Sequence, residues 1–313
     1  DGYVSASEII LDKFPKIACF KFESINFELI ESPDIEKRLS ALSLIPFQVR
    51  TSPELFNNHQ NITFFTKIEP LLNKKHPNRN EAFISFGKFI FNQKLAKIKY
   101  SEDILKIIIK CKKVIAESLD SKQAIYALLA SLIADPSTFE RDSSIIFQQP
   151  ISTYLVDGFK TIIEIEPSKQ NFIWTNFMIM ADKLFLSENP NSDQLTFVFQ
   201  SLLKLEIHNS LISITNAIQY SKYLYLSRPK IELRKAVVDF LLKFNKENQS
   251  EEIILILLTY VGIETDETMR INVINKISST PLVTQDIVST FQSFLTDFSR
   301  KIREHSYTYL NRF

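Results

Sequence analysis

Glycine is scarce in this chain, with only 4 among 313 residues, far below the usual ~7%. Glycine supplies the positive-φ positions of tight hairpins and of the loops that hold phosphate groups. Its scarcity therefore argues against β-rich and nucleotide-binding folds. Because abundant Lys, Asn, Ile and Phe suggest an A/T-rich genome, which would deplete glycine anyway, the fold class must be argued from periodicity.

An excess of charge is missing too. The chain has 37 basic and 36 acidic residues and a formal net charge of +1, which gives no bulk attraction to nucleic acid or to an anionic membrane. We expect no nucleic-acid partner. The two cysteines, Cys19 and Cys111, are isolated thiols of the kind that a reducing compartment allows. They favour a cytoplasmic location and argue against a disulfide.

Long apolar runs are absent. The longest unbroken run, from Ala124 to Ala130, is far short of the ~18 residues that a membrane span needs. No signal peptide opens the sequence, and we expect no integral membrane segment. Since the chain starts at Asp1 rather than Met, we interpret it as a piece of a much longer protein.

Apolar residues do recur at the helical period. The clearest case follows Pro229, where one stripe at i, i+3, i+4, i+7, i+8 and i+11 contains Leu233, Ala236, Val237, Phe240, Leu241 and Phe244. Stripes at Ala82–Ile90 and Ile104–Ile115 follow the same rule, and Ser101 offers a capping hydroxyl to the second. Further helices are predicted over 123–134, 145–165, 169–187, 193–206, 210–226, 251–261, 268–278, 284–296 and 298–311.

Two stretches are less regular. Ile253–Leu258 could be a buried strand, but the acids before it and Gly262 after it favour a helix. Residues 1–30 show weak periodicity, and residues 136–150 have the composition of a longer loop. Helices joined by short polar loops, without clear strands, indicate stacked antiparallel helical hairpins.

Five predicted helices begin with an arginine that is followed three positions later by a small or apolar residue. The pairs are Arg38 and Ala41, Arg79 and Ala82, Arg234 and Val237, Arg270 and Val273, and Arg303 and Ser306. The first two arginines are 41 residues apart, and the last three are 36 and 33 apart. Self-similarity at roughly 33–47 residues is typical of helical solenoids.

These arginines are interpreted as structural. The stem of each would cover apolar surface while its planar head bridges carbonyls or carboxylates, and the small residue would let a neighbouring helix approach. Asp34 and Asp266 stand four residues before Arg38 and Arg270, a spacing that brings opposite charges together on a helix.

The sequence therefore predicts an all-α fold, an α-solenoid of HEAT or armadillo type. We expect one such segment over 1–313, with divergent repeats in 1–60 and 136–190. Trp174, the only tryptophan, is expected to pack between repeats beside Phe172, Phe177 and Met178.

Chemistry-bearing motifs are not apparent. The histidines His59, His76, His208 and His305 are scattered without metal-ligand spacing. No glycine-rich loop, nucleophile elbow or kinase catalytic motif occurs. We expect no catalytic, cofactor-binding or metal-binding residues in this segment, which would not itself be an enzyme.

The strongest candidate for binding is a basic helix face. Seven lysines fall within twenty residues, namely Lys94, Lys97, Lys99, Lys106, Lys110, Lys112 and Lys113. Of these, Lys106, Lys110 and Lys113 share one face opposite the apolar stripe. Such a face could make a weak contact with an acidic partner, a phosphoinositide or nucleic acid; the plainer interpretation is a solvated surface.

The order of several sequence blocks resembles the HEAT-repeat region of TOR (target of rapamycin) kinases, members of the phosphatidylinositol-3-kinase-related family. The blocks are Pro-Lys-Ile-Glu-Leu-Arg-Lys-Ala (229–236), Leu-Leu-Thr-Tyr-Val-Gly-Ile-Glu-Thr-Asp-Glu-Thr-Met-Arg (257–270), Phe-Ser-Arg-Lys-Ile-Arg-Glu (298–304) and, upstream, Arg-Asn-Glu-Ala-Phe-Ile-Ser-Phe-Gly (79–87). The resemblance is strongest over the last third, extends to 78–134, and is absent from 1–60 and 136–190.

This resemblance implies a scaffold role in a large serine/threonine kinase whose catalytic domain lies outside this sequence. The segment would dock a Raptor-like subunit and help the parent kinase associate with itself. One alternative is a different HEAT protein, such as an importin-like transport receptor or a general protein-binding scaffold. The other is an all-α enzyme with an unrecognised site.

Overall fold

A computed structural model describes residues 25–187, 191–207, 212–225 and 230–312. Within these ranges the chain forms α-helices and short 3₁₀ helices and no strand. The predicted all-α class is confirmed. The helices group into two compact units, Asp1–Ile173 and Trp174–Phe313, and each is described by itself. The single continuous segment over 1–313 stays a prediction.

Unit 1 contains α-helices of 11–17 residues, one α-helix of a single turn and several short 3₁₀ turns. Its elements are η2 (Phe27–Glu31), α2 (Ile35–Thr51), η3 (Pro53–Leu55), α3 (Asn58–Ile68), η4 (Glu69–Leu72), α4 (Arg79–Leu95), α5 (Glu102–Ala116), α6 (Lys122–Ala134), η5 (Pro136–Thr138), the single turn α7 (Phe139–Asp142), η6 (Ile146–Gln148), α8 (Thr153–Ile165) and η7 (Pro167–Lys169). The next helix, α9 (Gln170–Phe185), begins in unit 1 and continues into unit 2.

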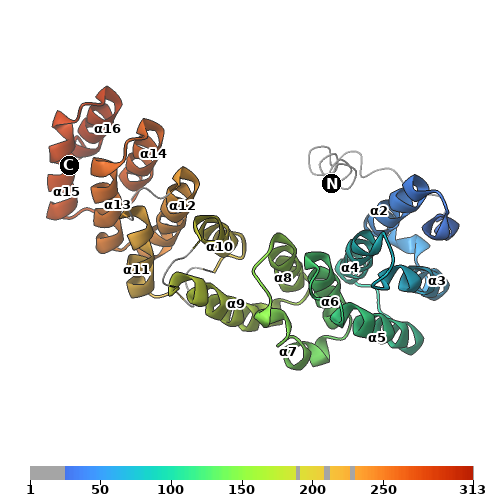
Figure 1. Cartoon of the computed structure of the whole chain (residues 1–313). Coiled ribbons are helices and arrows are strands. Elements are labelled where there is room, and N and C mark those ends of the chain that lie inside the picture. The colour runs from blue at the N-terminus through green and yellow to red at the C-terminus, as the bar shows by residue number, and fades with distance from the viewer. Residues whose placement is uncertain (1–24, 188–190, 208–211, 226–229, 313) are drawn as a thin grey trace. The chain divides into compact units, whose positions relative to one another are not determined.

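These helices stack in two rows. The first row is α2, α4, α6 and α8, each packed against the next, and α3 and α5 pack together in the second row (Figure 1). The helix α2 lies in the first row beside α4 and carries Arg38, although the sequence there was expected to be a divergent repeat. Much of the core between the rows is aromatic. The rings of Phe64 and Phe89 stack with centroids 3.7 Å apart, and Phe89 belongs to the apolar stripe predicted over Ala82–Ile90.

The centre of unit 1 is the helix α6, in which every residue from Ala124 to Ala134 is buried. Two glycines let its neighbours approach this closely. A Cβ added at Gly87 of α4 would lie 2.6 Å from Cδ1 of Tyr126, and one at Gly158 of α8 would lie 2.6 Å from Cδ1 of Leu129. Real Cβ atoms do not tolerate such distances, so these two glycines serve helix packing and not turns.

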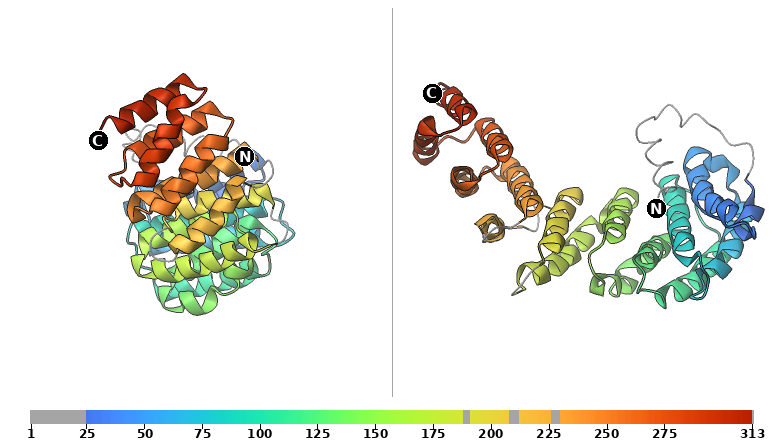
Figure 2. Two further views of the ribbon diagram at one scale, coloured as in Figure 1. Left: turned by 90° about the vertical axis from the view of Figure 1, so that its left-hand side faces the viewer. Right: turned by 45° about the horizontal axis from the view of Figure 1, so that its top comes forward.

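Unit 2 repeats the hairpin pattern more regularly. After α9 it contains α10 (Ser192–Lys204), α11 (Ile214–Tyr225), α12 (Ile231–Asn248), α13 (Glu251–Ile263), α14 (Glu267–Ser278), α15 (Gln285–Ser293), η8 (Phe294–Thr296) and α16 (Arg300–Leu310). The helices α10, α12, α14 and α16 form one row and α11, α13 and α15 the other. Both rows can be followed in the right-hand view of Figure 2.

Most predicted helices are confirmed to within a few residues, including α13, where a strand was the alternative. One boundary is wrong, since the helix expected over 145–165 begins only at Thr153. Residues Ile146–Gln148 form a 3₁₀ turn instead. Ser152 then caps the helix by accepting a hydrogen bond from the N–H of Leu155. The expected loop over 136–150 contains short helical turns. Gly262 lies inside the last turn of α13, not after it. Residues 1–24 lie outside the described residues.

Trp174 joins successive helices of unit 2. Its indole Nε1 donates a hydrogen bond of 2.9 Å to the carbonyl of Leu205, the residue that caps the end of α10. This bond links the two helices of one hairpin, and the predicted packing of Trp174 between repeats stays a prediction.

Candidate functional site

The repeated arginines occupy an equivalent place in the structure. All five lie on even-numbered helices, which form the first row of each unit, and Arg38, Arg234, Arg270 and Arg303 are each the fourth residue of their helix. Arg79 differs, since it is the first residue of α4. The residue three positions after each arginine is buried, as predicted: Ala41, Ala82, Val237, Val273 and Ser306.

Four of these arginines reach the segment that precedes the next helix of the same row. Arg38 Nε donates to Oδ1 of Asn78 at 3.0 Å, and Nη2 of Arg79 lies 3.8 Å from Oδ2 of Asp120. Arg234 Nε and Nη2 donate to Oε2 and Oε1 of Glu264 at 2.8 and 3.2 Å. Arg270 makes a bidentate pair with the carboxylate of Asp297. Each arginine therefore links one hairpin to the following one, and we call this set the arginine ladder.

The best-buried links lie in unit 2. The side chain of Arg270 is 1% exposed and that of Asp297 is 9% exposed. The Nε of Arg270 also donates to the carbonyl of Val261 at 2.7 Å, and its guanidinium lies 4.7 Å from the ring centroid of Phe298. A buried arginine with all of these partners holds two hairpins in a fixed register.

Glu264 is the acceptor with the most donors. Besides Arg234, it accepts from the hydroxyl of Tyr260 and from the backbone N–H groups of Thr265 and Asp266 at 2.8 and 2.9 Å. Burial opposes ionisation, but hydrogen bonds from Arg234, Tyr260 and the backbone outweigh it and lower the pKa of Glu264 from 4.5 to about 2. This carboxylate is ionised at neutral pH.

The acids four residues before two of the arginines have a different role from the one that their spacing indicates. The carboxylate of Asp34 accepts from the N–H groups of Glu36 and Lys37, and that of Asp266 accepts from the N–H of Met269. They cap α2 and α14, because the free N–H groups of a helix start compete for the nearest short acid. The pairing expected for them was wrong.

The basic face predicted on α5 exists but is partly neutralised. Lys106, Lys110 and Lys113 are exposed on this helix, opposite buried Ile104, Ile108, Cys111 and Ile115. However, Nζ of Lys106 lies 3.3 Å from Asp103 and Nζ of Lys110 lies 2.7 Å from Glu69. The hydrogen bond from Lys110 to Glu69 raises the pKa of this lysine. Among the described residues, Lys113 has no carboxylate partner.

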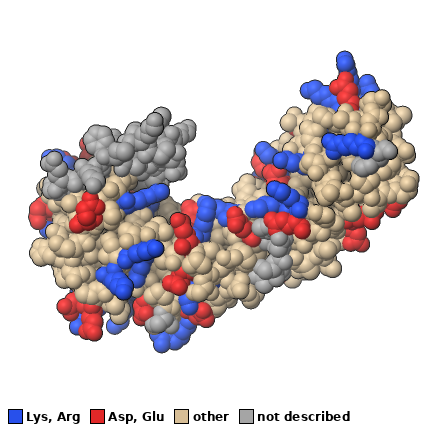
Figure 3. Space-filling view, turned by 180° about the vertical axis from the view of Figure 1, so that it is seen from behind, with Lys and Arg blue, Asp and Glu red and all other residues tan. Residues whose placement is uncertain are grey.

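Of the other four lysines of the cluster, two have hydrogen-bond partners and two do not, among the described residues. Lys112 pairs with Asp142 at 2.8 Å, and hydrogen bonds from Arg141 and Lys112 hold the pKa of Asp142 well below its usual range. Lys94 donates to the carbonyl of Ala134 at 2.9 Å, at the end of α6, and burial lowers its pKa. Lys97 and Lys99 are exposed and unpaired in the described part of the chain. Acidic and basic side chains also lie close together on the face shown in Figure 3.

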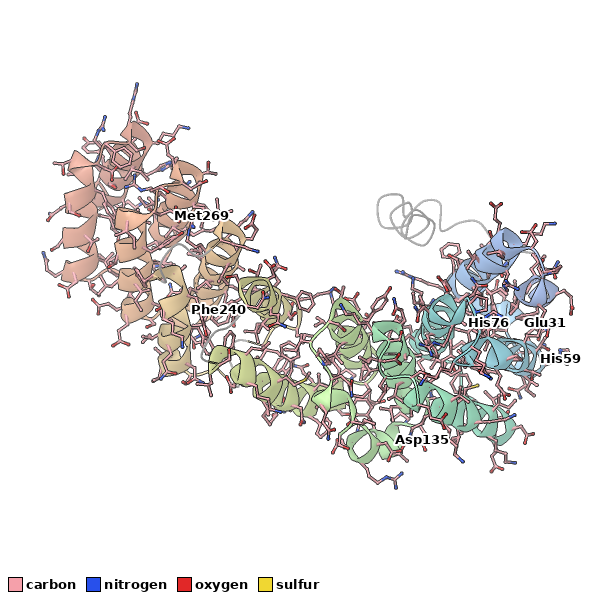
Figure 4. The ribbon with its side chains drawn as sticks, in the orientation of Figure 1. Glu31, His59, His76, Asp135, Phe240 and Met269 are labelled. Carbon is pink, nitrogen blue, oxygen red and sulfur yellow. The ribbon has the colours of Figure 1, made fainter. Side chains whose placement is uncertain are left out.

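No metal centre is evident in the part of the chain that the structure describes. His59 and His76 lie apart in unit 1 (Figure 4), and Nδ1 of His76 accepts a hydrogen bond of 3.2 Å from the N–H of Asn78. His305 lies on α16, and His208 is outside the described residues. Within the described ranges, no group of three or more His, Cys, Asp and Glu side chains could hold a metal ion. Among the described helices, none is both long and apolar enough to cross a bilayer.

Comparisons with known proteins add little. No family model matches the chain. No curated protein matches it either. Among solved structures, the crystal structure of an engineered protein is similar over 91% of this chain and 76% of its own, at 14% identity and a TM-score of 0.40. A likeness this low carries no argument about fold or function.

Sequence reasoning missed the acceptors of the arginine ladder. Glu264 and Asp297 are acids that lie between helices, 30 and 27 residues after their arginines. Their only shared signal is the position three residues before the next helix of the row, and this can be recognised only when the helix boundaries are known.

Proposed function

We propose that this chain is a non-catalytic helical-repeat scaffold that binds protein partners, as a segment of a TOR-like serine/threonine kinase. The observation that carries the proposal is the arginine ladder. Its charged groups are committed to holding hairpins in register, and stacked hairpins in register present long rows of helices to a partner.

The kinase assignment is supported by sequence blocks that coincide with equivalent structural positions. Arg234, Arg270 and Arg303, which lie in the blocks that resemble TOR kinases, are all fourth residues of consecutive first-row helices in unit 2. On this proposal, the partner is a Raptor-like subunit, the location is cytoplasmic, and the catalytic domain lies in another part of the parent protein.

The test is direct binding of the full chain to the recombinant Raptor-like subunit of the same organism, measured by calorimetry and by size-exclusion chromatography. We expect a stoichiometric complex. No complex at protein concentrations of tens of micromolar, or a parent gene without a downstream kinase domain, would overturn the proposal.

A second arm tests the basic face of α5. The triple variant Lys106→Glu, Lys110→Glu and Lys113→Glu is compared with a control of equal net charge that carries Glu at three exposed lysines elsewhere in unit 1, Lys74, Lys75 and Lys122. If the α5 face docks the partner, only the first triple variant weakens binding, by tenfold or more. Equal affinities would show that these lysines are solvated surface.

A further inference from the structure

Arg303, the fifth repeated arginine, is not part of the arginine ladder, because it makes no forward link among the described residues. Arg38, Arg234 and Arg270 each donate to a side chain that precedes the next first-row helix. Arg303 occupies the same place on α16, yet its Nη1 donates only to the carbonyls of Asp297 and Phe298, at 2.6 and 3.1 Å. Its Nε and Nη2 have no acceptor among the described residues.

The contacts of Arg38 show what such an arginine does when its link is complete. Its Nη1 donates to the carbonyl of Ser32, six residues earlier, at 2.9 Å, while its Nε reaches Asn78 of the next first-row helix. Arg303 makes the same bond to the carbonyl six residues earlier, that of Asp297. The guanidinium is therefore held in place by its own loop, and within the described ranges its remaining N–H groups are free for a second acceptor.

The apolar surface next to Arg303 is also uncovered. The residue four positions after the arginine lies on the same side of the helix. It is 3% exposed at Leu42, 1% at Val238 and 0% at Ile274, but Tyr307, the equivalent residue of α16, is 61% exposed. The side of α16 that corresponds to a packed surface on α2, α12 and α14 thus carries a large exposed aromatic ring beside a partly bonded guanidinium.

We propose that this side of α16 docks an α-helical hairpin that supplies an aspartate or glutamate to Arg303. The acid should stand three residues before the second helix of the hairpin, as both existing acceptors do. Glu264 lies three residues before α14, which begins at Glu267, and Asp297 lies three residues before α16, which begins at Arg300. The carboxylate would accept from Nε and Nη2 of Arg303, and the hairpin would cover Tyr307. This surface does not depend on the Raptor-like partner, so the two proposals can fail separately.

The chain itself provides the probe. A copy of residues 281–313 appended after residue 313 adds one hairpin with the natural spacing of 33 residues, and the copied Asp297 then follows Arg303 by 27 residues, as Asp297 follows Arg270. Because Tyr307 is larger than Ile274, a second arm carries Tyr307→Ile. Hydrogen exchange followed by mass spectrometry reports whether the appended amides are protected.

The proposal predicts protected appended amides in at least one arm. The protection of the appended amides should fall at least tenfold with Arg303→Met. In a charge-swap variant, Arg303→Asp is combined with a change of the copied aspartate to arginine. This variant should recover most of the protection that Arg303→Asp alone removes. An appended hairpin that is unprotected in both arms would overturn the proposal. Protection that is the same with and without Arg303→Met would also overturn it, because the carboxylate would then have no part in docking.

Discussion

The buried carboxylate of Glu264 should make unit 2 sensitive to acid. Its pKa is lowered from 4.5 to about 2, and at about 1.4 kcal/mol for each tenfold change in proton affinity this amounts to about 3 kcal/mol of stability. A carboxylate with a lowered pKa stabilises the fold above its unfolded pKa. The contribution is therefore complete above about pH 4.5 and is lost as the pH falls towards about 2.

The perturbation is Glu264→Gln, which keeps the size of the side chain but cannot ionise. We expect the variant to be less stable than the parent at pH 7 by about 3 kcal/mol, and the difference to shrink as the pH falls from 4.5 to 2. The assay is hydrogen exchange of the amides of α13 and α14, corrected for the intrinsic pH dependence of exchange. Chemical denaturation, followed by the fluorescence of Trp174, gives a second measurement in the same unit. A difference between parent and variant that stays constant over this pH range would refute the reasoning.

Three further predictions concern packing, reactivity and the ladder. Gly87→Ala should destabilise unit 1 by about 1–3 kcal/mol, since the added Cβ would meet the ring of Tyr126 on α6. The control is Gly262→Ala, whose Cβ meets nothing within 4 Å and which should be neutral or stabilising. Equal effects of the two variants on thermal unfolding would contradict this. Burial raises the pKa of Cys111 to about 12. In a variant that lacks Cys19, a disulfide reagent at pH 8 should therefore label Cys111 only after unfolding. Rapid labelling of the native chain would refute the burial of this thiol. Arg270→Met should cost about 3–5 kcal/mol in urea unfolding because it leaves a buried carboxylate unpaired. The double variant with Asp297→Asn should recover part of that loss; a single variant as stable as the parent would show that the pair contributes little.

The helices could be predicted because their apolar spacing is a local signal. The stripe from Leu233 to Phe244 becomes the buried side of α12, and the acids before Ile253 do mark the start of α13. The helix expected from residue 145 was wrong at its start because Ser152, which follows Pro150 and Ile151, acts as the N-cap of the helix that begins at Thr153. Capping is decided by one hydrogen bond, whereas periodicity averages over several turns.

The site could be predicted only in part, because its decisive contacts are not local. The lysine spacing on α5 placed Lys106, Lys110 and Lys113 on one exposed side, which the structure bears out. It could not show that Glu69, from the 3₁₀ turn η4 and 41 residues earlier, lies against Lys110. A basic patch is defined by the charges that surround it in space. Lys106 and Lys110 are already paired, and Lys113 is the one lysine of the three without a carboxylate partner in the described part of the chain. A partner that binds this face must therefore displace Asp103 and Glu69 or contact the face mainly through Lys113.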